Sequence, residues 1–338
     1  MTSIDYESIG KRAFEWCLNS LKSTYKTFTD TDLDIDIKYW VNNDISIGGR
    51  SSFDGKNYLL SINKGVFKEI DSIFYTLLES ELEENQKTRE DFYQKVSFEF
   101  GDYDRQRAKI YSEILITLSI DIIIFHELGH IMDGHLGYLN ELKSGCTAYL
   151  NNSVSNDVDN LVNQILEMDA DSFAATRIID AIIYDKNIDN YNKTHENIIK
   201  SKNHAFWLAT VAATVVFSLQ GMGRSRAEKE LKLAYYLPLR TRHHHFINCL
   251  IASHNAIEVK ERLKFTEDFL MEVIPNIEEF INLYFRGTFD FDEIDANLNN
   301  NLHELDKSYI DHYHELNRIW TRDIRDKLVQ YSYFELAD

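Results

Sequence analysis

The longest apolar stretch of the chain covers residues 110–125 and leads directly into a polar motif. Its sequence, IYSEILITLSIDIIIF, is rich in Ile and Leu, and its only charged residues are Glu113 and Asp121. It contains neither Pro nor Gly, so nothing in it interrupts a helix. The pattern therefore predicts a helix that is buried on most sides and continues without a break into residues 126–130.

Three further regions repeat apolar residues at helical spacing. The first covers residues 4–27 and the second residues 157–183, where Ser155 or Asn156 can cap the first turn. The third covers residues 260–337 and includes an aromatic and charged helix from His303 to Phe334. The apolar positions that define the first two helices are Phe14, Cys17, Leu18 and Leu21, and Val158, Leu161, Val162, Ile165 and Leu166.

Two segments near the N-terminus have the character of strands. Leu33–Val41 and Tyr58–Asn63 alternate or carry β-branched residues, and turn signals lie between them at Gly48-Gly49 and Asp54-Gly55. We expect a small antiparallel sheet, which makes the fold class α+β and predominantly helical.

Residues 203–223 are uncharged over a length that approaches a membrane span, with Lys202 and Arg224 at the two sides. The segment also contains polar residues, including His204, Thr210 and Thr214, and its apolar centre is short. No second segment of this kind accompanies it. These features favour a buried core helix, packed through its alanines against the helices predicted at residues 110–130 and 157–183, and argue against a helix in lipid.

The composition indicates one continuous body of 338 residues, because 44% of the chain is hydrophobic and it holds only 2 Pro. Within a single domain, residues 1–105 would form the N-terminal helix and sheet, residues 106–260 a helical core, and residues 261–338 the C-terminal helices. A net charge of −19 argues against binding to nucleic acid or to an anionic membrane surface.

The cysteines and the N-terminal residues indicate the compartment. Cys17, Cys146 and Cys249 are widely spaced and form no CxxC pair, which is typical of free thiols in a reducing environment. The first residues have early acids and no apolar run, so we expect no signal peptide. The cytoplasm is the expected location.

The polar motif, His-Glu-Leu-Gly-His at residues 126–130, has the spacing of a metal site. On a helix His126 and His130 project from one face about one turn apart and can both reach a single Zn²⁺. Glu127 lies beside them and can take a proton from a water molecule that the cation polarises. The other His-Glu pairs of the chain, at residues 195, 303 and 314, lack the second histidine.

A catalytic zinc ion needs one more protein ligand, and the helix predicted at residues 157–183 offers two acids four positions apart. Glu167 can complete the ligand set, while Asp171 can hold a ligating imidazole through its second ring nitrogen. The alternative is an ordinary acidic surface face. The apolar and small neighbours Met168, Ala170 and Phe173 argue against that alternative, because they indicate a packed helix.

HELGH followed on a later helix by ExxxD resembles the gluzincin zinc metallopeptidases, a group that includes thermolysin-like enzymes and membrane-associated CAAX-processing relatives. The resemblance implies a zincin-like fold and a site in which His126, His130 and Glu167 bind zinc. It further implies that Glu127 is the general base and that Asp171 supports a histidine ligand. In metallopeptidases an edge strand beside the HExxH helix aligns the substrate backbone, so one of the strands expected at residues 33–41 and 58–63 would form the rim of the substrate cleft.

The longer form HELGHxxxxH, completed by His135, is similar to the CAAX-type subgroup in particular, in which the extra histidine is not a metal ligand. The short interval between the two motifs is typical of a compact member. Small cytosolic peptidases of phage exclusion are a further candidate group, without specific matching residues. The resemblance covers about residues 110 to 180.

Residues 235–245, YYLPLRTRHHH, join a charged segment to an apolar helix at residues 246–256. CAAX-type relatives carry a similar Pro- and Arg-containing segment after the ExxxD helix, although Tyr236 stands here in place of their leading histidine. Peptide hydrolysis develops an oxyanion that a His, Tyr or Arg can stabilise, and His243 and Tyr236 are the best candidates. The three histidines could instead form a second metal site or an exposed loop.

These patterns predict a zinc-dependent endopeptidase that hydrolyses a protein or peptide substrate inside a cell. One alternative is a non-catalytic regulatory or interaction module with a structural zinc ion, in which His135 or Cys146 would be the fourth ligand. The retained Glu127 argues against it, because a structural site needs no general base. The other alternative is a membrane-embedded peptidase, which depends on residues 203–223 alone.

Overall fold

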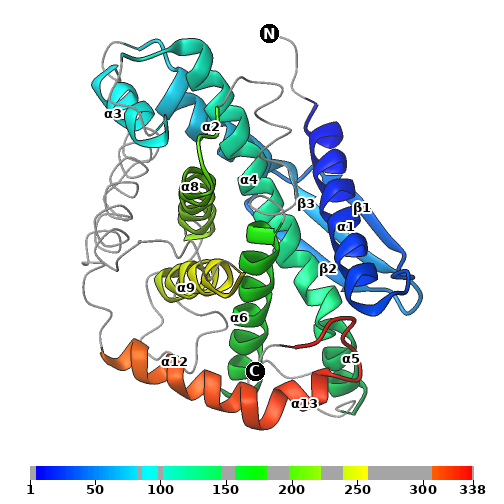
Figure 1. Cartoon of the computed structure of the whole chain (residues 1–338). Helices are drawn as coiled ribbons and strands as arrows, with labels where there is room; N and C mark the ends of the chain where they lie inside the picture. The colour runs from blue at the N-terminus through cyan, green and yellow to red at the C-terminus, as the bar shows by residue number, and fades with distance from the viewer. Residues whose placement is uncertain are drawn as a thin grey trace.

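Helix α4 (Arg105–Met132) runs through the middle of the structure (Figure 1). The computed structural model describes residues 5–82, 86–97, 102–145, 157–180, 198–221, 239–257 and 307–336. Asp104 caps the first turn of α4, because its carboxylate accepts hydrogen bonds from the backbone N–H groups of Gln106 and Arg107. The helix then continues without a break to Met132, which confirms the prediction that the apolar helix from residue 110 runs into the motif.

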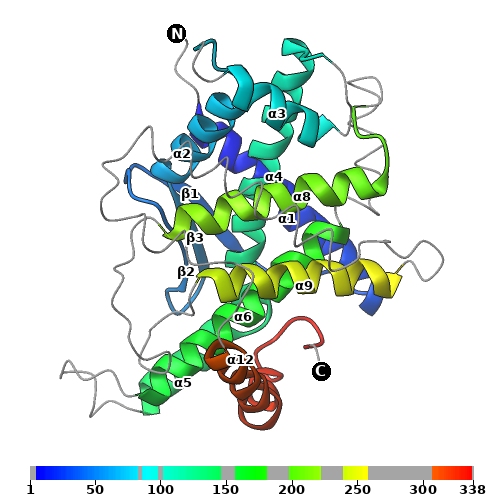
Figure 2. The same ribbon diagram turned by 90° about the vertical axis from the view of Figure 1, so that its left-hand side faces the viewer.

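The other helices are arranged around α4. Figures 1 and 2 place α8 and α9 on one side of it and α1 on the other. The bounds of these helices are Tyr6–Thr29 (α1), Lys64–Phe74 (α2), Gln86–Ser97 (α3), His135–Gly145 (α5), Asp157–Ile179 (α6), Lys202–Gly221 (α8), Leu239–Ile257 (α9), Lys307–Ile319 (α12) and Arg325–Leu328 (α13). Short π-helical segments at Tyr75–Glu79 (η1) and Trp320–Ile324 (η5) extend α2 and α12.

The helix expected at residues 4–27 is confirmed as α1, which lies against α4. Phe14, Cys17 and Leu21 form its buried face together with Gly10. The Trp16 ring meets the Phe125 ring edge-on with 5.9 Å between the centroids. The apolar spacing seen in the sequence is therefore the contact face of the helix.

The sheet is mixed, so the expectation of an antiparallel sheet is wrong. Its strands β1 (Ile37–Asn42), β2 (Gly49–Phe53) and β3 (Tyr58–Asn63) lie in the order β1-β3-β2. β2 and β3 form an antiparallel hairpin through the turn at Asp54-Gly55, whereas β1 pairs in parallel with β3. The reason is that an additional strand, β2, begins at the Gly48-Gly49 position where the sequence indicated only a turn.

Helix α8 packs inside the protein, as predicted for residues 203–223 as far as Gly221. Ser119 of α4 donates a hydrogen bond to the Ala212 carbonyl at 3.5 Å, and the residues from Ala205 to Val216 are buried. Thr210 and Thr214 donate hydrogen bonds to carbonyls one turn earlier, at 3.0 and 2.8 Å. Both threonine hydroxyl groups are therefore satisfied within the helix.

By length and composition, α4 is the one described helix that could cross a membrane, and 78% of its most apolar window is buried inside the protein. This burial is typical of a core helix.

Ala212→Leu is expected to lower the free energy of unfolding by about 1–3 kcal/mol, because the added carbons have no space between α8 and α4. Urea denaturation of the two proteins measures this difference. An unchanged transition midpoint would show that Ala212 does not lie in a closely packed contact.

The segment after α13 covers the C-terminal end of α4. The backbone N–H of Tyr333 donates a hydrogen bond to the Met132 carbonyl at 2.7 Å. Gly134, with φ +81°, and Gly137 lie directly under Tyr331, where a methyl group on either glycine would come within 2.7 Å of it. The end of the motif helix is therefore closed by residues far away in the sequence.

The described part of the helix expected at His303–Phe334 ends at Leu328.

Candidate metal centre

Helices α4 and α6 approach each other closely at the HELGH motif. A methyl group on Gly129 would lie 3.2 Å from the Ala170 Cα atom and 3.2 Å from the Phe173 Cβ atom. The absence of a side chain at Gly129 therefore lets α6 approach α4 closely. This approach brings Glu167 of α6 opposite the two histidines of α4.

The three expected ligand atoms converge. His126 Nε2 lies 3.6 Å from Glu167 Oε2, and His130 Nε2 lies 3.5 Å from Glu167 Oε1. All three donor atoms lie within 4.8 Å of one another. Zinc bonds of about 2.0–2.1 Å in a tetrahedral arrangement would hold such atoms about 3.3 Å apart. The three side chains therefore fit one zinc ion, which both histidines would bind through Nε2.

Asp171 lies on the opposite side of the His126 ring. Its Oδ1 atom is 2.9 Å from His126 Nδ1, and its side chain is almost completely buried. A carboxylate in this position fixes the orientation of the imidazole, so that Nε2 is directed at Glu167. Asp171 is thus placed where the sequence predicted it.

Arg242 of α9 joins both carboxylates of α6. Its Nε and Nη2 atoms donate hydrogen bonds to the two oxygens of Asp171 at 2.7 and 2.8 Å, and Nη1 lies 2.9 Å from Glu167 Oε2. Burial alone would raise the pKa of Glu167 and that of Asp171, but Arg242 and the histidines outweigh it and lower both pKa values. Both carboxylates therefore stay ionised. Because the single guanidinium neutralises only one of these two negative charges, a negative charge remains that can attract a cation.

The sequence did not single out Arg242, because residues 235–245 were expected to form a connection. The structure is instead helical from Leu239, so the alternative prediction that the three histidines form an exposed loop is wrong. Successive residues of a helix project about 100° apart, and Arg242 and His243 therefore face different neighbours. The available signal was an arginine just before the apolar helix expected at residues 246–256, because an arginine that becomes buried needs a partner.

His243 lies against α8. Its Nε2 atom is 3.2 Å from Thr214 Oγ1, and its ring is next to that of Phe217. Burial, together with His244, lowers the pKa of His243 to about 3, so the side chain is neutral. It is Arg242, and not His243, that reaches Glu167. Tyr236, the other oxyanion candidate, lies outside the described residues.

Glu127 lies beside the first residue of β2. A methyl group on Gly49 would be 2.9 Å from Glu127 Oε1, so the absence of a side chain leaves room for the carboxylate. β2 is at the edge of the described sheet, paired with β3 on one side. The candidate base is therefore adjacent to a strand that can present its backbone to a peptide.

Gly49→Ala is expected to lower hydrolysis at least 10-fold without loss of zinc, because the new methyl group must displace the Glu127 carboxylate while the three ligands stay in place. Gly48→Ala is the matched control, since its methyl group would meet only Asn63 Nδ2, at 3.4 Å. Peptide turnover and zinc content are measured for both variants. Equal turnover in the two would show that Glu127 can move without consequence.

The structure brings a third histidine, His135, to the cluster but directs neither of its nitrogens at the candidate zinc position. Its Nδ1 atom lies 2.8 Å from His130 Nδ1, and its Nε2 atom lies 2.9 Å from Asp169 Oδ2. Cys146, the other candidate for a fourth ligand, lies outside the described residues. Within the described ranges, no fourth His, Cys, Asp or Glu joins the group formed by His126, His130 and Glu167.

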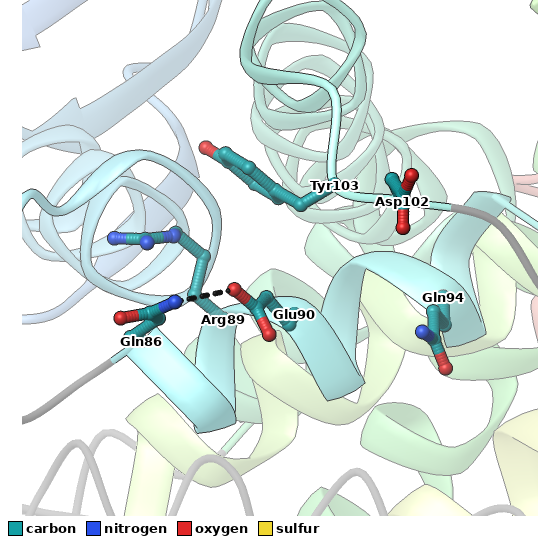
Figure 3. A pocket seen from close by; sticks show the side chains of 6 residues that line it. All are labelled: Gln86, Arg89, Glu90, Gln94, Asp102 and Tyr103. Atoms are coloured by element: carbon teal, nitrogen blue, oxygen red, sulfur yellow. Dashed lines mark hydrogen bonds between the residues drawn. The ribbon is translucent and has the colours of Figure 1, made fainter.

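A polar depression of about 420 Å³ lies at the other end of α4 (Figure 3). Side chains of α3 and of the segment before α4 line it, and Gln86 donates a hydrogen bond to Glu90, one turn further along α3, at 2.9 Å. From Arg105 to His126 the helix rises by about 30 Å. The depression is therefore remote from the candidate metal centre. Its lining residues are Gln86, Arg89, Glu90, Gln94, Asp102 and Tyr103.

Comparisons of the chain with protein-family models, with curated proteins and with solved structures give no match. The function is therefore inferred from the residues of the site and their geometry.

Proposed function

We propose that this protein is a zinc-dependent endopeptidase with a zincin-like fold, acting on a protein or peptide substrate in the cytoplasm. The observation that carries the proposal is the convergence of His126, His130 and Glu167 beside a second, separate carboxylate, that of Glu127. Three protein ligands are the set typical of a catalytic zinc ion, whereas structural sites usually have four.

The roles of the residues follow from their positions. A zinc ion, when bound, supplies a Lewis acid that lowers the pKa of a water molecule and polarises a carbonyl group. Glu127 would accept a proton from that water and return it to the leaving amine. The β2 edge would align the substrate backbone next to Glu127, and Asp171 would keep the His126 ring in the ligating orientation.

Arg242 adds a fixed positive charge behind the ligands. Because its guanidinium binds Asp171 through two nitrogens and Glu167 through the third, it holds the relative position of the two acids on α6. It also keeps Glu167 ionised, which is the form that a metal requires. We assign Arg242 to positioning of the site.

A structural zinc module is the rival function, and the arrangement of His135 argues against it. Both ring nitrogens of His135 are engaged by His130 and Asp169, so it is not available as a fourth ligand in this geometry. The position of Glu127 beside an edge strand has no purpose in a purely structural site.

The proposal is tested by the metal content of the purified protein together with its activity on unfolded proteins. We expect one zinc ion per chain, and new N-termini in a mixture of unstructured proteins when mass spectrometry compares reactions with and without a chelator. Absence of chelator-sensitive cleavage at full zinc occupancy would favour the structural rival.

Glu167→Ala is expected to remove most of the bound zinc, because two histidines alone remain as ligands. Asp171→Ala should weaken zinc binding by about 10- to 100-fold, since it removes the support of a ligand and not a ligand itself. Competition with a chelator of known affinity measures both effects. The reverse order of the two variants would show that the roles of the acids are exchanged.

A further inference from the structure

His130 and His135 form a chain of contacts that ends on α6. Gly134, with φ +81°, turns the chain after α4 so that His135, the first residue of α5, lies against the ring of His130. The two Nδ1 atoms are 2.8 Å apart, and His135 Nε2 is 2.9 Å from Asp169 Oδ2. His135 is completely buried, so no water competes for these contacts.

The proton positions in this chain follow from the proposed metal site. A histidine that binds a cation through Nε2 carries its proton on Nδ1. His130 therefore donates to His135 Nδ1, which must be the acceptor. The proton of His135 is then on Nε2 and is donated to Asp169. Only this order of donors makes both contacts hydrogen bonds.

We propose that His135 and Asp169 are positioning residues that hold His130 in the tautomer and orientation needed to bind the metal. This inference rests on the proposed zinc site. It gives α6 three roles at alternate positions, because Glu167 is a ligand, Asp171 supports His126 directly, and Asp169 supports His130 through His135. Each ligating imidazole thus has a carboxylate behind it.

The same residues allow a competing arrangement. Asp133, His135 and Asp169 have donor atoms within 4.8 Å of one another and could hold a second cation. In the structure, however, Asp169 and His130 engage both nitrogens of His135. A cation at His135 Nε2 would have to replace its hydrogen bond to Asp169, so we favour the positioning role.

The experiment compares zinc affinity in two substitutions of His135. His135→Phe keeps the volume but removes the acceptor for His130, and it should lower zinc affinity about 10- to 100-fold. His135→Asn places a side-chain oxygen where Nδ1 now lies and should keep the affinity within a few-fold of the wild type. Rescue by Asn distinguishes a hydrogen-bonding role from a role in packing.

His204→Phe is the matched control. His204 is also completely buried and hydrogen-bonded, with Nε2 2.6 Å from the Val96 carbonyl, but it lies outside the cluster. This variant should lose stability without a change in zinc affinity. The absorption spectrum of the cobalt-substituted protein is a second readout, and it should change in His135→Phe but not in His204→Phe.

Two results would overturn the proposal. The first is equal zinc affinity in the wild type and His135→Phe. The second is two zinc ions per chain in the wild type with one of them lost in His135→Phe, which would establish the second cation site. Zinc affinity is measured without turnover, so normal zinc binding without hydrolysis would defeat the peptidase function and leave this test intact.

Discussion

Glu127→Gln is expected to lower peptide hydrolysis by about 10²- to 10⁴-fold while zinc content stays unchanged. The amide has nearly the shape of the carboxylate and fits the space beside Gly49, but it cannot accept a proton from water. Because Glu127 is not among the three converging ligands, the metal should remain bound. Initial rates and metal analysis on the same preparations measure the two quantities.

Glu113→Gln provides the control for this experiment. Glu113 lies on the same helix, on its exposed face, and the same chemical change there should leave both hydrolysis and zinc content as in the wild type. Hydrolysis by Glu127→Gln at the wild-type rate would mean that another group takes the proton. The assigned mechanism would then be wrong.

Arg242→Gln is expected to lower the free energy of unfolding of the zinc-free protein by about 3–5 kcal/mol. Asp171 and Glu167 are buried, and the substitution removes the only guanidinium that contacts them in the described part of the chain. Arg322→Gln is the control, since Arg322 makes the same two-nitrogen contact to a neighbouring carboxylate, Asp323, at an exposed site. It should change stability little.

The effect of Arg242→Gln should depend on pH. In the wild type the pKa values of Glu167 and Asp171 are lowered, so their contribution to stability is present above the pKa of the unfolded chain, about 4, and is lost as pH falls through the folded values. Without Arg242, the largest contribution that lowers these pKa values is lost and burial is opposed by the histidines alone, so both pKa values should rise. The difference between the two proteins should therefore narrow as pH falls, beginning at the raised pKa values of the variant and continuing below about pH 4, where the wild type loses its own contribution. Urea denaturation at several pH values measures this trend.

The helices and the ligand positions could be read from the sequence because they depend on local spacing. Positions 126 and 130 must share a helix face whatever surrounds them, and the periodicity of residues 157–166 shows which part of α6 is helical. The apolar neighbours of Glu167 indicated that this acid faces the core. The structure brings all three expected ligands together, with their donor atoms within 4.8 Å of one another.

The contacts between distant segments could not be predicted in this way. The parallel pairing of β1 with β3 depends on where β2 is inserted in the sheet, which short strands do not specify. Arg242 reaches Asp171 because α9 begins at Leu239 and crosses α6 with one particular rotation. A shift of one residue in that rotation would direct His243 at the acids instead.

His135 and Asp169 are an intermediate case. The sequence showed a histidine five positions after the second ligand, and the acid at 169 stands between two acids that had been assigned roles. Their contact depends on the turn at Gly134, whose positive φ is a property of the folded backbone. Sequence spacing identified the residue, but the structure was needed to show its partner.

The hydrogen bond from Tyr333 to Met132 has a consequence for synthesis of the protein. The two residues are about 200 positions apart, and a ribosome that adds about 5–20 residues per second needs tens of seconds to make the intervening chain. During that time the last turn of α4, with both HELGH histidines close by, has an unpaired carbonyl and an uncovered surface at Gly134 and Gly137. The contact that closes the end of the motif helix can therefore form only after translation has passed residue 333.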